Sequence, residues 1–462
     1  MNRKASNLRP EFAVLLPFVT ALLILIVMRP YFGLADDWSF LVALDSAKHD
    51  GLWSMAIHYI QDDYAWGMIR PYYPFVSYVF YSLGLLSPLL MYVLNWAVVC
   101  GIVALLALVF ARVFFPETSP SRRTFFLAFC AAYFILPQST FLLIIAAMQE
   151  KWVLLATAAS FFWFLKQDER SPALRYYVGS VLVLAIGFAM KAQFAMMIPA
   201  LVIFLGLRAI SGRLSFLRAA FIILPSVLCL GFLKHVAAQG SYTSRFGGQN
   251  LLAKIVENLH SPQFLLIGAI GLLWAGFVLF SKRSPQGKDK ILWLLPSIFI
   301  FSFLALFLQW TYAGYLMAGV AFITAMMCAL WVTTLSARWQ LPAIVALALI
   351  ASAVTVLKFS QRAGAYGSLG EFLGSNEIQT IARNKAPVFI SCPEASVALR
   401  TYAKKFFELD ADFVSVDKVT PQTKPRYAFR DRLFCPLGIG YNETSVVWTS
   451  KKPDSFQLVT LD

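Results

Sequence analysis

The chain consists of long apolar runs separated by short polar connections, and this pattern limits its fold more than any other feature. The first run, Phe12 to Met28, has about the length that an α-helix needs to cross the hydrocarbon core of a bilayer. Of the 462 residues, 59% are hydrophobic and only 14% are charged. Soluble domains carry about 25% charged residues. We therefore predict a polytopic α-helical membrane protein.

Further spans are expected along most of the chain. Apolar stretches at 72–115 and 125–148 are interrupted near Gly84–Pro88 and at Pro137. Each interruption is either a tight turn between two crossings or a kink within one. The total is then about 11 to 13 spans. The later spans are expected at residues 152–165, 176–190, 193–207, 221–233, 264–280, 292–308, 313–332 and 341–357.

Basic residues set the orientation of these spans. They precede the first span and recur in later connections on the same side: Arg3, Lys4, Arg9, the loops 166–175, 208–218 and 282–290, and Arg338. Since cytoplasmic loops are enriched in Lys and Arg, this side and the N-terminus are assigned to the cytoplasm. The same dispersed distribution explains most of the net charge of +15, so nucleic acid is not expected as a partner.

The first outer loop, residues 29–73, is the most informative connection. Asp36 and Asp37 lie a few residues beyond the first span, where ionisable groups are expensive and usually functional. Apolar residues recur through the loop at helical spacing, which predicts one or two amphipathic helices at the membrane interface. One carboxylate is suited to accept the proton of an incoming hydroxyl, while the other fixes a metal or a cation.

Two cations on the outer side suit an anionic headgroup. Arg70 begins the next apolar run from this side, and Lys191 lies where no aqueous loop separates two spans. Snorkelling of Lys191 to the interface is an equal alternative. Asp62 and Asp63 either solvate a helix end or pair with Arg70.

Two further outer segments contain candidate site residues. Glu150 and Lys151 begin another span and form either an internal ion pair or, through Glu150, a second acidic group of the site. Arg245 lies in a polar, glycine-rich loop within 235–261, which suits a mobile cover over a substrate or an ordinary connector. Arg245 is therefore a candidate for substrate binding.

The C-terminal part differs in character from the rest. Residues 1–358 are expected to form the transmembrane catalytic module, 359–374 a linker, and 375–462 a small α/β domain at the outer face. Alternating runs at 388–391 and 445–448 predict strands, and residues 395–408 predict a helix. Cys392 and Cys435 can pair there if the domain faces an oxidising compartment.

Together these features resemble the GT-C superfamily of multi-span glycosyltransferases, which includes protein O-mannosyltransferases and the aminoarabinose transferases of lipid A. The resemblance rests on Asp36-Asp37 in the first outer loop, Arg70-Pro71 before the second span and Lys191 between later spans. It implies transfer of a sugar from a polyprenyl-phosphate donor to a hydroxyl of a glycolipid, polysaccharide or protein acceptor. It also implies a catalytic base at Asp36 or Asp37, lipid-phosphate binding at Arg70 and Lys191, and an acidic site group at Glu150.

The chemistry of that reaction predicts inversion at the anomeric carbon. Lipid phosphate is a good leaving group that needs cations instead of a general acid, so a single carboxylate base on the opposite face suffices. No cofactor is specified, and a divalent metal at Asp36 or Asp37 stays open. A bacterial inner membrane is favoured over endoplasmic reticulum. The alternative functions are an oligosaccharide polymerase or ligase acting on a polyprenyl-diphosphate carrier, and a transporter or flippase for lipid-linked sugars.

Overall fold

The structure is a computed structural model, and it describes most of the chain. The described residues are 10–32, 44, 47, 49–65, 68, 70–146, 148–169, 174–190, 197–210, 215–239, 253, 256, 258–283, 288–306, 320–391, 393–430, 442–451 and 456–462.

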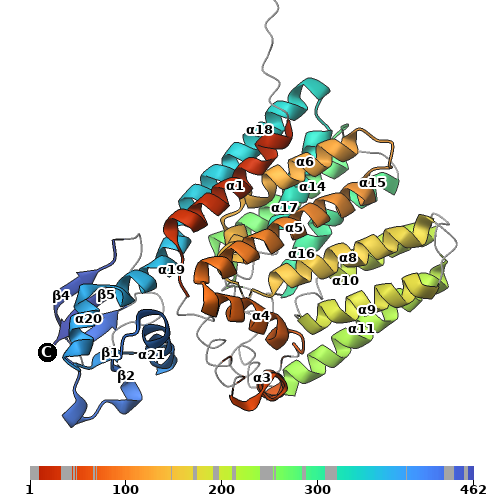
Figure 1. Cartoon of the computed structure of the whole chain (residues 1–462). Coiled ribbons are helices and arrows are strands. Elements are labelled where there is room, and N and C mark those ends of the chain that lie inside the picture. Colours follow the sequence, from red (N-terminus) through yellow and green to blue (C-terminus); the bar gives the residue numbers. More distant parts are fainter. Residues whose placement is uncertain are drawn as a thin grey trace, which may run out of the picture.

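Helices make up the first three quarters of the described chain (Figure 1). In order they are α1 (Pro10–Met28), α3 (Leu52–Ala65), α4 (Tyr73–Leu86), α5 (Pro88–Phe114), α6 (Ser121–Ala132), η1 (Tyr133–Ile135), η2 (Pro137–Thr140), α7 (Phe141–Ile144), α8 (Glu150–Glu169), α9 (Leu174–Met190), α10 (Met197–Ile210), α11 (Phe216–Gln239), α14 (Pro262–Phe280), α15 (Lys288–Trp293), α16 (Leu295–Leu306), α17 (Ala321–Thr333) and α18 (Ala337–Val354).

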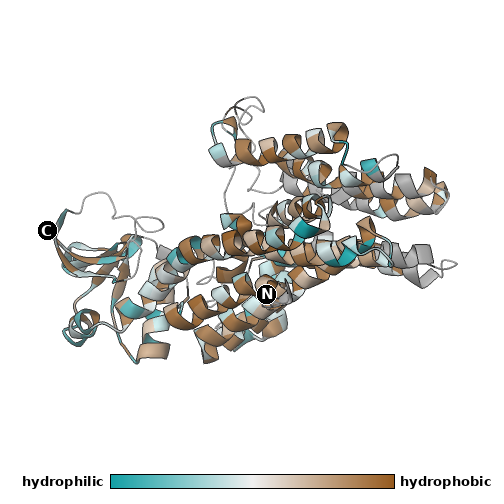
Figure 2. Ribbon diagram, turned by 90° about the horizontal axis from the view of Figure 1, so that it is seen from above, coloured by the Kyte–Doolittle hydropathy of each residue, from teal (hydrophilic) through white to brown (hydrophobic). Residues whose placement is uncertain are grey.

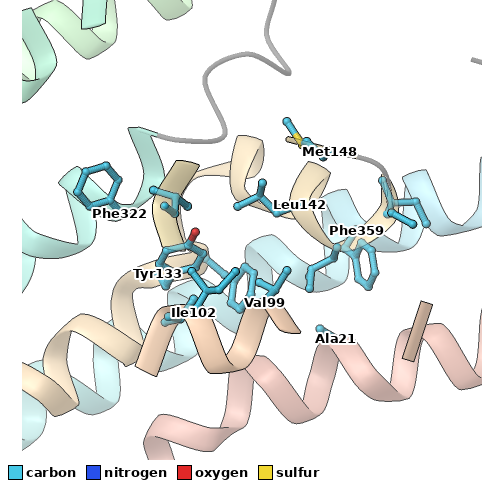
Figure 3. Packing of buried hydrophobic residues seen from close by; sticks show 14 of the residues in the cluster. Ala21, Val99, Ile102, Tyr133, Leu142, Met148, Phe322 and Phe359 are labelled. Atoms are coloured by element: carbon cyan, nitrogen blue, oxygen red, sulfur yellow. The ribbon is translucent and has the colours of Figure 1, made fainter. Parts of the chain in front are cut away.

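Helix α5 lies at the centre of the bundle, where it packs against α1, α4, α6 and α8. Its buried face contributes Val99 and Ile102, which lie beside Tyr133 of η1 in an apolar cluster that also contains Leu142 of α7 (Figure 3). Helices α1 and α18 run side by side on one flank, and α8 to α11 form the opposite flank (Figure 1). The bundle helices are predominantly hydrophobic along their length (Figure 2), as expected for segments in contact with lipid.

Both interruptions seen in the sequence are breaks between helices. Near Gly84–Pro88 the chain leaves α4 and starts α5, with Ser87 extended and its side chain accepting a hydrogen bond from the backbone N–H of Leu90 at 3.4 Å. At Pro137 the helical segments 121–135 and 137–144 meet at 84°. The first segment ends because Leu136 has an extended backbone and the ring of Pro137 cannot continue the helix. The second segment therefore starts in a new direction, nearly perpendicular to the first.

Within the described ranges, two helices are long and apolar enough to cross a bilayer. They are α5 and a helical segment of 47 residues, 337–383, in which a turn at Gly374 and Ser375 separates the last two helices. The bent pair at Pro137 would add a third if it counts as one span. Several other apolar helices are shorter, among them α4, α14 and α17. The predicted polytopic helical class is therefore confirmed in its coarse form, and the number of spans stays a prediction.

The long helix connects the bundle to a small C-terminal sheet. It consists of α18, the π-helical turn η5 (Thr355–Phe359), α19 (Ser360–Leu373) and α20 (Asn376–Arg383), so residues 360–373 of the expected linker are helical. The remaining elements are β1 (Val388–Ile390), α21 (Pro393–Phe407), β2 (Phe413–Ser415), η6 (Val416–Lys418), η7 (Pro421–Thr423), β3 (Tyr427–Arg430), β4 (Glu443–Thr449) and β5 (Gln457–Leu461).

The sheet has five strands in the order β2-β1-β3-β5-β4. Strand β1 pairs in parallel with β2 and β3, and β5 pairs antiparallel with β3 and β4. Helix α21 is the crossover between the parallel strands β1 and β2, as such connections require. The predicted strands at 388–391 and 445–448 and the predicted helix at 395–408 are confirmed within two residues at each end.

Candidate functional site

The first outer loop starts from a fixed point. Immediately after α1, the backbone N–H of Tyr31 donates to the carbonyl of Tyr366 in α19 at 2.9 Å, and the hydroxyl of Tyr92 in α5 donates to the carbonyl of Tyr31 at 2.7 Å. Both polar backbone groups of Tyr31 are therefore satisfied by other elements. Phe32 is fully buried beside it. The chain that continues to Asp36 and Asp37 thus leaves from a rigid junction, while these two candidate catalytic residues lie outside the described residues.

Helix α3 lies in this loop, for which one or two amphipathic helices are predicted, and its place at the membrane interface stays a prediction. Met55 and Ala56 are buried, whereas Trp53 and Ile57 are exposed. Aromatic contacts join α3 to the start of α4: the ring centroids of Trp53 and Phe75 lie 5.3 Å apart in an edge-to-face arrangement, and those of Tyr59 and Tyr73 lie 5.8 Å apart. Such contacts fix the angle between the two helices and so position the residues that connect them.

Arg70 lies in this connection and is paired with Asp63. Its Nε donates to Oδ2 of Asp63 at 2.8 Å and its Nη2 donates to Oδ1, which makes a two-point contact. The Asp63 side chain is 5% exposed and the Arg70 side chain 16% exposed. Of the two alternatives for the acidic pair at 62–63, pairing with Arg70 therefore holds for Asp63, while Asp62 is exposed on the outer surface of α3.

Burial and pairing act together on the charges of this pair. Burial raises the pKa of Asp63 above its usual range, and the hydrogen bond and positive charge of Arg70 oppose part of that shift. Burial alone would lower the pKa of Arg70, but the hydrogen bond and charge of Asp63 outweigh it, so the pKa of Arg70 is raised. Arg70 is therefore a permanent cation, whereas ionisation of Asp63 is less favourable than in water.

The guanidinium of Arg70 also lies over an aromatic ring. Its Cζ is 5.0 Å from the centroid of Tyr73, within the range of a cation–π contact. Its Nη1 and the outer hydrogen of Nη2 have no hydrogen-bond partner among the residues that the structure describes. One edge of the guanidinium is thus held in place, and the other remains able to donate to an anion.

A second polar cluster lies at the start of α8. Glu150 and Gln149 are buried, and Lys151 is completely buried. The ammonium group of Lys151 donates to Oδ1 of Asn95 in α5 and to the carbonyl of Ala146, and it lies 4.5 Å from the centroid of Phe80. Glu150 is the first residue of α8, and the helix dipole favours a carboxylate in this first turn.

Asn95 is the residue of this cluster that sequence reasoning missed. Its Nδ2 donates to the carbonyls of Leu142 at 2.9 Å and Leu143 at 2.8 Å, near the end of α7. It therefore satisfies two helix-terminal carbonyls and the Lys151 ammonium at once. A signal was present in the sequence, since Asn95 is an amide within an otherwise apolar segment.

The other candidate residues fall outside the described part of the chain, namely Lys191, Arg245, Cys392 and Cys435. Their predicted roles in phosphate binding, substrate binding and disulfide formation stay predictions. Within the described ranges no group of three or more His, Cys, Asp or Glu side chains is arranged to hold a metal ion. The metal left open at Asp36 or Asp37 stays open.

The fold and these clusters define an integral membrane protein whose helical bundle presents paired and buried charges beside a C-terminal α/β domain. Its fold is similar to that of ArnT from Cupriavidus metallidurans, in a crystal structure with bound undecaprenyl phosphate. The TM-score is 0.52, the sequences are 12% identical, and the match covers 99% of this chain and 98% of that one. No family model and no curated protein matches the sequence.

This likeness is one of fold, and it extends over nearly the whole chain. It therefore includes both the helical bundle and the C-terminal α/β part.

Proposed function

We propose that this protein transfers a sugar from a polyprenyl-phosphate donor to a hydroxyl group of a glycolipid, polysaccharide or protein acceptor at the outer face of a bacterial inner membrane. The observation that supports this most is the likeness to ArnT bound to undecaprenyl phosphate over 99% of the chain. A long lipid carrier needs a helical bundle with access from the bilayer, and Arg70 in the connection between α3 and α4 suits its polar end.

The proposed reaction needs few groups from the protein. The acceptor hydroxyl attacks the anomeric carbon and forms the new glycosidic bond, while the bond to the lipid phosphate breaks and the phosphate leaves with the electron pair. Asp36 or Asp37 takes the hydroxyl proton as general base. Because the base and the leaving phosphate lie on opposite faces of the sugar, the configuration at the anomeric carbon is inverted.

Cations stabilise the charge that develops on the departing phosphate. Arg70 is proposed for this role because its guanidinium has an edge without a protein partner among the described residues. Arginine is well suited to phosphate because its planar fork can donate two parallel hydrogen bonds. Lys191 is the second proposed phosphate ligand, and Glu150 and Arg245 are proposed to contact the sugar or the acceptor.

Sugar transfer in vitro tests this function. Purified protein in nanodiscs is given a panel of radiolabelled polyprenyl-phosphate sugars and candidate acceptors, and wild type is compared with Asp36→Asn and Asp37→Asn. We expect transfer by wild type, with opposite anomeric configurations in donor and product. In at least one variant the rate of transfer should fall by about two or more orders of magnitude. The exposed Asp62→Asn variant on α3 is the matched control and should keep full activity.

Two results would contradict the proposal. Retention of configuration would exclude direct displacement with a single base. Transfer that persists in both variants would remove the first outer loop from catalysis, and the base would have to be sought elsewhere, with Glu150 as the next candidate.

A further inference from the structure

The pair formed by Asp63 and Arg70 is poorly explained as a stabilising contact. The buried Asp63 and the partly buried Arg70 must lose much of their hydration, and their attraction often does no more than offset that loss. The direction of the Asp63 shift agrees, since burial raises its pKa in spite of the adjacent guanidinium. An apolar pair of similar size would serve stability at least as well, so the pair calls for another explanation.

The geometry of the pair supplies one. Asp63 takes Nε and one hydrogen of Nη2, which is the side-on edge of the guanidinium, and the Tyr73 ring supports its face. These contacts remove the rotational freedom of a long side chain. They leave Nη1 and the outer hydrogen of Nη2 directed away from the carboxylate, in a fork that matches two phosphate oxygens.

We propose that Asp63 is a positioning residue that holds the guanidinium of Arg70 with its outer edge available for the phosphate of the lipid donor. The inference rests on the proposed function, because it assumes that Arg70 binds this phosphate. Asp63 acts through Arg70 and does not contact the reacting atoms. A fixed guanidinium loses little further entropy when the phosphate arrives, which strengthens binding through preorganisation.

A simple electrostatic account predicts the opposite effect. If Asp63 only neutralises Arg70, its removal exposes a full positive charge and binding of a phosphate becomes tighter. If Asp63 positions Arg70, its removal loosens the guanidinium and binding becomes weaker. The sign of the change therefore separates the two accounts.

The test measures binding of undecaprenyl phosphate to the full-length protein in nanodiscs, with undecaprenol as the probe that lacks the phosphate. Wild type is compared with Asp63→Asn, Arg70→Lys, the double variant and Asp62→Asn. We expect Asp63→Asn to weaken binding of undecaprenyl phosphate about tenfold and to leave binding of undecaprenol unchanged. Asp62 is exposed and adjacent in sequence, so Asp62→Asn removes the same charge without touching Arg70 and should have little effect.

The double variant tests whether Asp63 acts through Arg70. Lysine cannot make the two-point contact, so Asp63→Asn should have little further effect in the Arg70→Lys background. In the transfer assay, Asp63→Asn should raise the KM for the donor more than it lowers kcat. If Asp63 had only a structural role, Asp63→Asn would weaken binding of undecaprenyl phosphate and of undecaprenol alike and would also lower the thermal unfolding midpoint.

The outcomes separate this inference from the proposed function. If wild type does not distinguish undecaprenyl phosphate from undecaprenol, both fail. If wild type does distinguish them and Arg70→Lys weakens binding, but Asp63→Asn leaves it unchanged or tightens it, only the role of Asp63 is overturned. Should Asp63→Asn not fold, Asp63→Ser also removes the carboxylate that holds the guanidinium, and wild-type affinity in that variant would equally contradict a positioning role.

Discussion

At the scale of single residues, the buried ammonium of Lys151 shows how the bundle accommodates a charge. The side chain has no exposed surface, yet it has acceptors in Asn95 and in the carbonyl of Ala146 and lies over the Phe80 ring. Asn95 in turn donates to the end of α7. An amide can fill this position because it is donor and acceptor at once, which neither a hydroxyl nor a carboxylate does with the same reach.

Removal of Asn95 should therefore destabilise the protein strongly. We expect Asn95→Leu to lower the free energy of unfolding by about 3 kcal/mol, because it removes one acceptor of the buried Lys151 ammonium and the side-chain donor to two helix-terminal carbonyls. The measurement is the thermal unfolding midpoint in detergent. In the double variant Asn95→Leu with Lys151→Met the buried charge is gone as well, so part of the loss should be recovered. A double variant as unstable as the sum of both single variants would show that the two side chains do not interact energetically.

The sequence identified some of these residues and missed others for a physical reason. Arg70 stood out because a cation at the start of an apolar run is unusual, and its pairing with Asp63 was one of two alternatives since they are close in sequence. Asn95 and Lys151 are 56 residues apart, and nothing local indicates that α5 and α8 bring them together. The structure does not describe four of the candidate residues, Asp36, Asp37, Lys191 and Arg245, so their roles stay predictions.

At the scale of elements, the two breaks at Gly84–Pro88 and Pro137 were visible in the sequence, but their geometry was not. Proline and glycine show where a helix stops, whereas the angle of the next helix depends on what packs against it. For η2 and α7 that partner is Arg362 of α19. Its guanidinium donates to the carbonyl of Pro137 at 2.6 Å and to Thr140, and lies 3.5 Å from the centroid of Phe141.

Arg362→Met should loosen this bent segment without unfolding the bundle. The variant removes one of the two donors to the Pro137 carbonyl, which keeps the hydroxyl of Thr140 at 2.8 Å. It also removes the cation from the Phe141 ring, so we expect faster hydrogen exchange at residues 138–146. The exposed Lys358→Met, one turn earlier in the same long helix, is the control and should leave exchange unchanged. Equal exchange in wild type and Arg362→Met would show that α7 is held by apolar packing alone.

The approach of α4 to Phe32 and α5 depends on a glycine. A Cβ at Gly84 would lie 2.9 Å from Sδ of Met91 and 2.9 Å from Cε1 of Phe32. Phe32 cannot move easily because it packs against Tyr81, Tyr402 and Phe406. We expect Gly84→Ala to lower the free energy of unfolding by about 1–3 kcal/mol through overpacking, measured by thermal unfolding.

Gly101 in α5 provides the control. A Cβ at Gly101 meets nothing within 4 Å, so Gly101→Ala should be neutral or stabilising. Equal effects of both substitutions would contradict this close contact.

At the scale of the whole molecule, the bundle and the C-terminal sheet share one apolar core. Composition predicted a separate domain from residue 375, because hydrophobicity falls there. That division stays a prediction, while residues of α1, α5, α19, α21 and the sheet belong to one continuous buried cluster. Tyr31 lies at the junction, with ring contacts to Tyr402 at 5.8 Å and Phe406 at 5.6 Å. A composition profile cannot detect such contacts because they join residues more than 350 positions apart.

The shared core predicts that the C-terminal part stabilises the bundle. Removal of residues 375–462 would expose Tyr31, Phe32 and Phe372, which pack on α21 and β3. We therefore expect the truncated protein to unfold at a clearly lower temperature in detergent than the full chain. In the full chain, Tyr402→Ala should lower the free energy of unfolding by about 3 kcal/mol, as for other large aromatic side chains, and so reproduce part of the effect of the truncation. Thr401→Ala on the same helix should lower it much less. If the truncated bundle keeps the unfolding midpoint of the full chain, the two parts fold independently, and the contacts at Tyr31 join two separate cores.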